Sequence, residues 1–389
     1  MHVFFITQWF PTLQQPFNGI FVLEHARAVA RIHSVTLLYI RGVDPTLKRT
    51  IKVTQDTDSA GFTVFELSYR HPRTPFTTWF RRISAGRQAF KMASDQYGRP
   101  DIIHANIWNT ADVAVLLGRL AGIPVVLSEH SSSYARKQLT PWQIRKMRFF
   151  MNRVDVIMPV CDALGTNIRD YGIHRPMLSV QNVADTEIFY PASAGEQVSS
   201  PYREIAVIAR LSEEKAVHLA IQAAARLQQQ GIFFQLHIAG DGPERAHLEH
   251  VVVETGISEW VHFHGYLPKP ELAKLLRRSS AFLLTSLWES QPVVILEALS
   301  CGLPVLAPAI GGIPEIITPE CGLLFQTGII EDLVSKLSTL IMNLPRYDSQ
   351  GIHQYAVEHF SPIVVGNRLD GIYRQVIDRP GRHDYASGN

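Results

Sequence analysis

This 389-residue sequence has few cysteines, no long apolar run and a formal net charge of only +2. Its three cysteines, Cys161, Cys301 and Cys321, show no CxxC spacing, which argues against a disulfide framework and fits a reducing compartment. No apolar run reaches the length of a transmembrane helix. The first residues lack a basic leader and a cleavage site, so we expect residues 2–7 to form a strand. These absences predict a cytoplasmic protein.

Signals for metal and nucleic-acid binding are also scarce. No cluster of His and Cys residues indicates a metal site, so none is predicted. Residues 1–190 carry 22 Lys and Arg against 14 Asp and Glu, whereas the remainder carries 15 against 21. The positive first half indicates an acidic partner. Because its basic residues come without a recognisable module, that partner is not expected to be nucleic acid.

The length and pattern of the chain predict a two-domain α/β protein. Hydrophobic residues make up 46% of the sequence, and the length predicts about two to three domains. Strand patterns alternate with helical patterns, which is typical of doubly wound parallel sheets. The polar stretch PASAGEQVSSP, residues 191–201, is the expected linker. We expect one domain over residues 1–190, a second over 202–361, and over 362–389 a tail with a helix that could cross back to the first domain.

The apolar periodicities predict individual elements. Strands are expected at residues 2–7, 35–40, 62–68, 101–105, 124–128, 155–160, 177–181, 204–209, 233–239, 261–264, 281–284 and 304–307. Helices are expected at residues 20–32, 79–97, 110–121, 142–152, 162–171, 216–229, 244–255, 270–278, 293–300, 330–342 and 362–377. Doubly wound domains bind ligands outside the carboxyl ends of their strands, so a cleft between the two domains is the expected site.

The stretch TSLWESQPVVILEALSCG, residues 285–302, combines a turn with an apolar helix. Glu289 lies in the turn, and Glu297 interrupts the helix, where an unpaired charge is costly. Pro292 suits the first helical position, and the free amides of that turn form a site for an anion. Glu297 therefore needs a partner, which is either a ligand diol or a buried arginine.

Two cations follow the strand expected at residues 204–209. Arg210 comes at its end, and Lys215 follows close to a helix start, where a lysine opposes the helix macrodipole. An anion beside both would explain this placement, because the two charges could neutralise a diphosphate leaving group. The alternative for Lys215 is a solvated position on the surface.

Glycine, aromatic and histidine residues near strand ends supply further candidates. Gly240 lets the backbone approach a ligand, and Gly19 lies between the first strand and the first helix, at a phosphate-facing position. Tyr266 either places a ring near a base or simply packs. His130 lies just past the strand expected at residues 124–128, and His104 lies at the end of the strand expected at residues 101–105. Either histidine could be a packed core residue, and core packing is the favoured interpretation of His104.

Together these residues resemble the retaining family-4 glycosyltransferases of GT-B fold, in which two Rossmann-like domains face each other across a cleft. The resemblance covers residues 5–361. Its most specific element is Glu289-x7-Glu297 within ESQPVVILEALSCGLPV, supported by ARLSEEK, AGDGP, HGY, GGIPE and QNVADTEIFYP. Gln291 and Pro292 replace a common Phe-Gly pair, and Ala216 replaces a common Gly, so the donor sugar is left undefined. The opening ITQWFPTLQQPFNGIF resembles bacterial cell-surface polysaccharide enzymes.

The resemblance implies transfer of a sugar, with retention, from a nucleotide diphosphate-sugar to a glycan acceptor, which we expect to be lipid-linked. No metal or cofactor is expected, because two cations and backbone amides would already stabilise the leaving group. Glu289 would contact the donor sugar, Glu297 the ribose hydroxyls, and His130 the reacting centre. The remaining donor-binding residues would be Gly19, Arg210, Lys215, Gly240, Tyr266, Ser290, Gln291, Pro292 and Val293. Arg210 and Lys215 would hold the diphosphate, and the leaving phosphate would help to deprotonate the acceptor. Glu289 is therefore not assigned as a covalent nucleophile.

Alternatives remain open at this point. A nucleotide-sugar epimerase of the same architecture would convert free nucleotide-sugar without an acceptor, and a silent binding subunit would bind the donor without transfer. Residues 69–91 and 134–153 mix cations with aromatic residues. They form either ordinary amphipathic helices or a surface for an anionic membrane, which would place the protein on the inner face of the plasma membrane.

Overall fold

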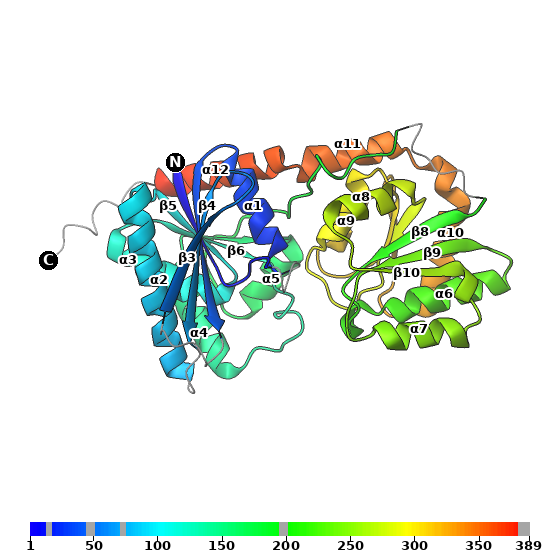
Figure 1. The fold of residues 1–389 in the computed structure, drawn as a ribbon, viewed down its shortest axis with the longest axis horizontal. Coiled ribbons are helices and arrows are strands. Elements are labelled where there is room, and N and C mark those ends of the chain that lie inside the picture. Colours follow the sequence, from blue (N-terminus) through cyan, green and yellow to red (C-terminus); the bar gives the residue numbers. More distant parts are fainter. Residues whose placement is uncertain (13–17, 44–50, 71–74, 194–200, 380–389) are drawn as a thin grey trace. The chain divides into compact units, whose positions relative to one another are not determined.

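A computed structural model describes residues 1–12, 18–43, 51–70, 75–193 and 201–379 of the chain. The chain forms two compact units (Figure 1). The first unit contains Met1–Asn182 together with Pro362–Asn389, and the second contains Val183–Ser361.

The first unit is built on a seven-stranded sheet with the order β3-β4-β2-β1-β5-β6-β7. The strands are β1 (His2–Thr7), β2 (Ser34–Val43), β3 (Ile51–Thr57), β4 (Thr63–Arg70), β5 (Ile102–Asn106), β6 (Val125–Glu129) and β7 (Val156–Pro159). Neighbouring strands run parallel, except that β3 pairs antiparallel with β4. The expected parallel sheet is therefore present, with β3 added antiparallel at one edge.

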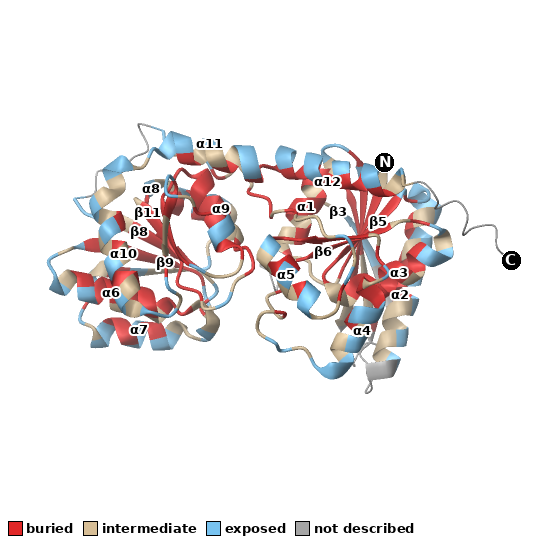
Figure 2. Cartoon of the chain, turned by 180° about the vertical axis from the view of Figure 1, so that it is seen from behind, coloured by how far each residue is buried: buried red, intermediate tan, exposed pale blue. Residues whose placement is uncertain are grey.

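The helices of the first unit are α1 (Ile20–Ala30), α2 (Pro75–Tyr97), α3 (Ala111–Ala121), α4 (Pro141–Met151), α5 (Asp162–Asp170) and α12 (Pro362–Ile377). Local sequence fixes the start of α4. At α4, the Thr140 side chain accepts from the Gln143 amide, and the Gln143 side chain accepts from the Thr140 amide, which together form a capping box. The central strands and the inner faces of the helices are buried, while the outer helix faces are exposed (Figure 2).

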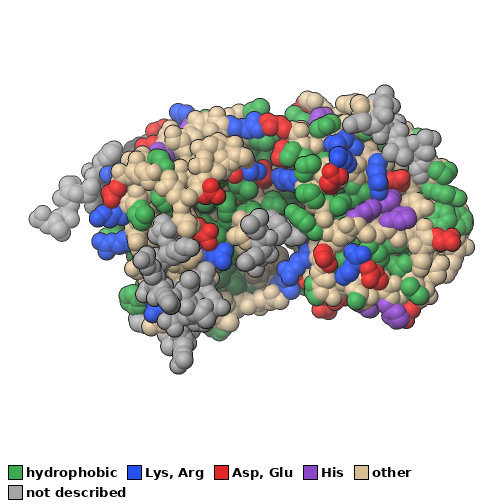
Figure 3. Space-filling view, viewed as in Figure 1, with side chains coloured by type: hydrophobic (Ala, Val, Ile, Leu, Met, Phe, Trp, Pro, Cys, Tyr) green, Lys and Arg blue, Asp and Glu red, His purple; other side chains and the backbone are tan. Residues whose placement is uncertain are grey.

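The second unit contains a six-stranded sheet with the order β10-β9-β8-β11-β12-β13. Its strands are β8 (Arg203–Ile208), β9 (Phe234–Ala239), β10 (Val261–Gly265), β11 (Ala281–Leu283), β12 (Val305–Pro308) and β13 (Gly322–Phe325). All five strand pairs are parallel. Its helices are α6 (Val217–Gln229), α7 (Arg245–Glu254), α8 (Lys269–Arg278), α9 (Val293–Ser300), α10 (Ile330–Asn343) and α11 (Ser349–Phe360). Histidine side chains gather on one face of this unit (Figure 3). His237 stacks on His262 and on His264.

The final helix, α12, returns to the first unit and packs on α1. His33 Nε2 lies 2.7 Å from Asp370 Oδ1, and the buried His104 Nδ1 lies 2.6 Å from the Tyr373 hydroxyl. These contacts come from residues far apart in the sequence, so they tie the end of the chain to the core of the first unit.

The second unit begins earlier in the chain than the expected boundary at residue 190. Ala184 and Phe189 are buried in its core, and the Ala184 amide donates to the Phe360 carbonyl at 2.8 Å. The segment before the expected linker therefore packs with the second unit. Residues 194–200 of that linker lie outside the described part of the chain.

Most predicted elements are present within a few residues of their expected ends, and α9 and α12 begin and end where the sequence indicated. The strand expected at residues 177–181 is wrong, because only an isolated bridge joins Met177 to Ile157. The sequence analysis missed β3, β13 and α11.

Candidate functional site

Three predicted site residues lie at one edge of the second sheet. Because β8, β9 and β11 are parallel neighbours, the loops that follow them meet at their carboxyl ends. Arg210, Gly240 and Glu289 lie in these loops. Backbone hydrogen bonds join the loops directly: the Ala209 amide donates to the Ala239 carbonyl at 3.1 Å, and the Leu287 amide donates to the Glu214 carbonyl at 2.8 Å.

Lys215 and Glu289 form an ion pair across this edge, with 2.6 Å between Nζ and Oε1. The exposed fractions of the two side chains are 25% and 11%. Lys215 ends the short 3-10 helix Glu213–Lys215, and its carbonyl accepts from the Thr285 hydroxyl at 3.0 Å. This partly buried pair joins Lys215, which is predicted to bind the diphosphate, to Glu289, which is predicted to contact the donor sugar. This position differs from the solvated alternative considered for Lys215.

Two glycine turns are packed too closely to carry a side chain. A Cβ at Gly240, where φ is +133°, would lie 1.8 Å from the Ala209 carbonyl oxygen. A Cβ at Gly311, where φ is +53°, would lie 2.2 Å from the Glu289 carbonyl oxygen. The Gly312 amide also donates to the Ser290 carbonyl at 2.7 Å. The Gly311 turn therefore fixes the backbone around Glu289, and the Gly240 turn fixes the close approach to Ala209, whether or not they also contact a ligand.

The start of α9 lies directly after Glu289 in the chain. Ser290 and Gln291 are buried, and Pro292 occupies the N-cap position, so Val293 is the first helical residue. Pro292 is therefore one position earlier than expected. Glu297 is 5% exposed on the buried side of the helix. The first turn of α9 thus follows Glu289 closely in the chain, and a helix N-terminus favours negative charge.

The other predicted donor residues of the second unit are more open. Arg210 is exposed, and Tyr266 is 46% exposed just after β10. Their predicted contacts with a ligand stay predictions, as does the partner of Glu297 in a complex.

In the first unit, Gly19 is the N-cap of α1 with φ of +73°. A Cβ there would lie 2.3 Å from the Trp9 carbonyl, so the close approach of the loop after β1 requires glycine. Its predicted contact with a phosphate stays a prediction.

His130 follows β6 and packs against α1. Its ring centroid lies 4.2 Å from that of Phe21 and 5.3 Å from that of His25, and burial lowers its pKa well below the ordinary value. His104 is fully buried between the Tyr373 and Ser128 hydroxyls, at 2.6 and 2.7 Å. The core-packing interpretation of His104 is therefore confirmed.

The sequence analysis missed Glu129, which organises the loop that carries His130. This buried carboxylate accepts from the backbone amides of Trp108, His130 and Ser131 at 2.7–2.9 Å and from the Tyr134 hydroxyl at 2.9 Å. Burial raises its pKa, and these donors oppose that rise. The only signal in the sequence was a carboxylate at the end of an apolar strand.

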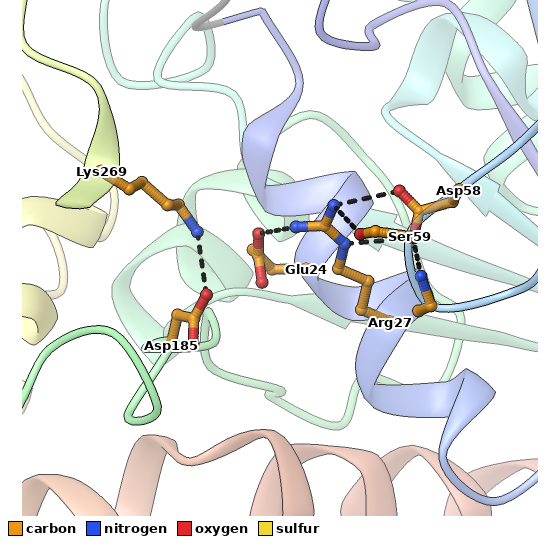
Figure 4. Close-up of polar contacts among 7 residues, drawn as sticks. Glu24, Arg27, Asp58, Ser59, Asp185 and Lys269 are labelled. Atoms are coloured by element: carbon orange, nitrogen blue, oxygen red, sulfur yellow. Dashed lines mark hydrogen bonds and ion pairs between the residues drawn. The ribbon is translucent and has the colours of Figure 1, made fainter.

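The sequence analysis missed an Asp-x-Asp pair, Asp56 and Asp58, whose spacing resembles a metal-binding motif. Figure 4 shows Asp58 held instead by Arg27, with Nη2 and Nε of the guanidinium 3.0 and 3.3 Å from its two oxygens. Arg27 also pairs with Glu24 at 3.1 Å. Among the residues that the structure describes, no group of His, Cys, Asp and Glu could hold a metal ion.

Because His25 is buried, we expect the protein to lose stability at acid pH. Burial lowers its pKa from 6.5 to about 4, although its hydrogen bond to the Gln181 carbonyl opposes the shift. Between these two pKa values the unfolded state binds more protons than the folded state. The contribution of neutral His25 to the free energy of unfolding is therefore fully present above pH 6.5 and is lost as the pH falls toward 4. The shift corresponds to roughly 3 kcal/mol of unfolding free energy.

Urea unfolding of wild type and His25→Gln at neutral and acid pH measures this contribution. The variant should lose less stability than the wild type on acidification. An equal loss in both proteins would contradict the assignment to His25.

Comparison with known families gives one match in each unit. A family described as Glycosyltransferase Family 4 matches residues 19–188, and one described as Glycosyl transferases group 1 matches residues 193–353. Within the described residues, no helix combines the length and apolar character that crossing a membrane requires.

Curated relatives match part of the chain. A putative colanic acid biosynthesis glycosyltransferase of Escherichia coli is 27% identical over 216 residues, which is 54% of this chain and 52% of the relative. A sulfoquinovosyl transferase of Arabidopsis thaliana is 29% identical over 263 residues, which is 62% of this chain and 50% of the relative. The chain spans about half the length of these curated relatives.

Solved structures match almost the whole chain. Sucrose-phosphate synthase from Thermosynechococcus elongatus has a TM-score of 0.75 at 18% identity, covering 96% of this chain and 98% of that one. Anabaena HepE in complex with UDP has a TM-score of 0.75 at 16% identity, covering 96% and 99%. With a family match in each of its two Rossmann-like units, the chain has the GT-B fold and belongs to the group 1 glycosyltransferases of family 4.

Proposed function

We propose that this protein is a retaining glycosyltransferase that moves a sugar from a nucleotide diphosphate-sugar to a glycan acceptor. The carrying observation is the Lys215–Glu289 pair beside the start of α9, at the carboxyl edge of a parallel sheet. A cation and the amides at a helix start suit a diphosphate, and a carboxylate next to the cation suits sugar hydroxyls. Neighbouring solved structures are complexes with UDP and with UDP-glucose, which supports a nucleotide-sugar donor.

In the proposed mechanism, Arg210 and Lys215 neutralise charge that develops on the leaving diphosphate. Glu289 and the amides that follow it orient the donor sugar, and Glu297 binds the ribose hydroxyls. The departing phosphate helps to remove the proton from the acceptor hydroxyl as the new bond forms on the same face. His130 acts at the reacting centre, and the Gly19 amide binds the diphosphate.

Sugar transfer itself tests the proposal. The full chain is incubated with UDP-, GDP- and ADP-sugars, with and without a panel of glycan acceptors, and products are identified by mass spectrometry and NMR. We expect an acceptor-dependent product with the anomeric configuration of the donor. Conversion of the free nucleotide-sugar without acceptor would support an epimerase instead. Binding without any conversion would support a silent subunit.

We propose that no metal ion takes part. Arg210, Lys215 and the helix amides already supply positive charge at the diphosphate, so a divalent ion is unnecessary. The rate of sugar transfer in the presence of EDTA should equal the rate in its absence. Complete loss in EDTA that Mg²⁺ or Mn²⁺ restores would contradict this proposal.

We propose that the acceptor is lipid-linked and serves cell-surface polysaccharide synthesis. Support comes from similarity to the E. coli colanic acid relative and to the fold of a lipopolysaccharide outer core galactosyltransferase. An acceptor of this kind would be met at the inner face of the plasma membrane, where the protein would bind peripherally.

The surface proposed for the membrane is smaller than the two stretches suggested by sequence. Arg82 and Lys146 both pair with the carboxylate of Asp112, which is fully buried and also accepts from Trp79 Nε1 at 2.9 Å. Arg148 Nε donates to the Tyr171 carbonyl. These three cations hold the fold together and are poor choices for a lipid-binding test.

The exposed parts of α2 and α4 are better candidates. Phe80, Trp142 and Phe149 are 53%, 57% and 50% exposed, respectively. On α2, Arg87 and Lys91 continue the exposed face that begins at Phe80, and on α4, Arg145 lies one turn after Trp142. Both helices pack against α3. Together these six residues, named here the α2–α4 surface, combine aromatic rings with cations.

We expect the α2–α4 surface to bind anionic vesicles. The triple variant Arg87→Ser, Lys91→Ser, Arg145→Ser should reduce flotation with anionic vesicles, since each cation contributes about 1 kcal/mol there. A control that removes three exposed cations elsewhere, Arg226→Ser, Lys274→Ser and Arg368→Ser, should float like wild type. Equal flotation with neutral and anionic vesicles, or no flotation with either, would contradict the membrane proposal.

A further inference from the structure

A polar cavity lies in the second unit at the amino ends of the strands, on the side of the sheet opposite the Lys215–Glu289 pair. Its volume is about 430 Å³, which is within the usual range for small-molecule sites. Its lining includes Arg203 at the start of β8, Ser280 just before β11 and Pro304 just before β12. Since these strands are parallel, their starts share one edge and their ends share the other. The cavity is therefore separate from the Lys215–Glu289 pair.

Three arginines line this cavity, but only one of them has a carboxylate partner. Arg278 Nε lies 3.3 Å from Glu204 Oε2. Arg277 instead donates to the Ile188 carbonyl at 3.4 Å and lies over the Tyr190 ring at 4.6 Å. Among the described residues, no carboxylate pairs with Arg203 or Arg277. The cavity thus holds two cations whose charge is not compensated nearby.

The rest of the lining combines neutral polar groups with an apolar wall. Burial raises the pKa of Cys301 to about 12, so at neutral pH this side chain is an uncharged thiol. Ser279 and Ser280 add hydroxyls, and Leu303 and Tyr347 add apolar surface. An anion that enters would therefore meet two guanidinium groups that have no carboxylate partner among the described residues, with an apolar surface available for the body of the ligand.

We propose that this cavity is a second ligand site that binds a small phosphomonoester such as a sugar phosphate. Arg203 and Arg277 hold the phosphate, because planar guanidinium groups donate paired hydrogen bonds to its oxygens. The wall that includes Leu303 and Tyr347 contacts the sugar. Binding at this edge does not require the donor site, so both sites can be occupied together.

Isothermal titration calorimetry of the full chain with glucose 6-phosphate and with inorganic phosphate tests the proposal. The double variant Arg203→Gln, Arg277→Gln should weaken glucose 6-phosphate binding at least tenfold. Lys274→Gln, which removes an exposed cation one turn earlier on α8, is the matched control and should bind like wild type. Lys215→Ala, which disrupts the donor edge, should also leave this affinity unchanged.

Four results would overturn the proposal. These are no saturable binding to wild type, equal affinity in the double variant, loss of binding in Lys215→Ala, or inorganic phosphate binding as tightly as glucose 6-phosphate. Arg203→Gln alone provides a further variant, because Arg203 is exposed and its replacement is not expected to disturb packing. This single variant should also bind glucose 6-phosphate more weakly than wild type does. An unchanged affinity would remove Arg203 from the site.

Discussion

Replacing Lys215 with alanine is expected to lower kcat/KM for sugar transfer by about 10²-fold or more, the scale of losing one electrostatic stabiliser in an active site. Two effects act in the same direction. The leaving diphosphate loses a cation, and Glu289 loses the partner that lies 2.6 Å from its carboxylate. An unpaired carboxylate would then repel the diphosphate. Initial rates over a range of donor concentrations measure the effect, and nucleotide diphosphate affinity should fall as well.

Lys274→Ala is the control for this experiment, because Lys274 is an exposed cation that pairs only with Glu271 within its own helix in the described structure. It should retain wild-type kinetics. Thermal unfolding of both variants checks that the fold is intact. Wild-type kcat/KM in Lys215→Ala would remove this lysine from the mechanism.

Glu289→Gln is expected to separate transfer from nucleotide binding. Glutamine keeps the shape of the side chain but loses the negative charge that orients the donor sugar, so kcat/KM should again fall by about 10²-fold. The bare nucleotide diphosphate should bind no more weakly than to wild type, because the change removes a nearby negative charge and releases Lys215. Initial-rate kinetics and calorimetry with the nucleotide diphosphate measure the two quantities.

Glu289→Asp supplies the matched control, since it keeps the charge and shortens the side chain by one methylene. It should retain more activity than Glu289→Gln if the charge is what matters. A parallel loss of transfer and of nucleotide diphosphate affinity in Glu289→Gln would show that Glu289 only supports the local fold.

The sequence predicted the site edge because strand ends can be recognised locally. Apolar runs locate β8, β9 and β11, and the turn after each carries residues whose chemistry stands out, such as Arg210, Gly240 and Glu289. In a parallel sheet these turns must meet, so their proximity follows from topology. The apolar run that fixes α9 likewise gave its bounds without knowledge of its neighbours.

Other features depend on contacts that no local pattern contains. The segment IKVTQDT of β3 is polar, and it becomes a strand through antiparallel pairing with β4. The sequence could not show that Asp112 neutralises two cations, because those cations come from two other helices, α2 and α4. The same pairing shows why counting cations along residues 69–91 and 134–153 overstated the surface available to lipid. Side chains at helical spacing reveal a face, but only packing shows which charges are already neutralised.

The most direct measurement of the central claim is a thermal-shift screen of wild type and Lys215→Ala with UDP-, GDP- and ADP-sugars in the presence of EDTA. A ligand that binds only the folded state raises the unfolding temperature by mass action. We predict that one class of nucleotide-sugar stabilises wild type and that the shift largely disappears in Lys215→Ala. No shift with any nucleotide-sugar, or an equal shift in both proteins, would contradict a donor site at the Lys215–Glu289 pair.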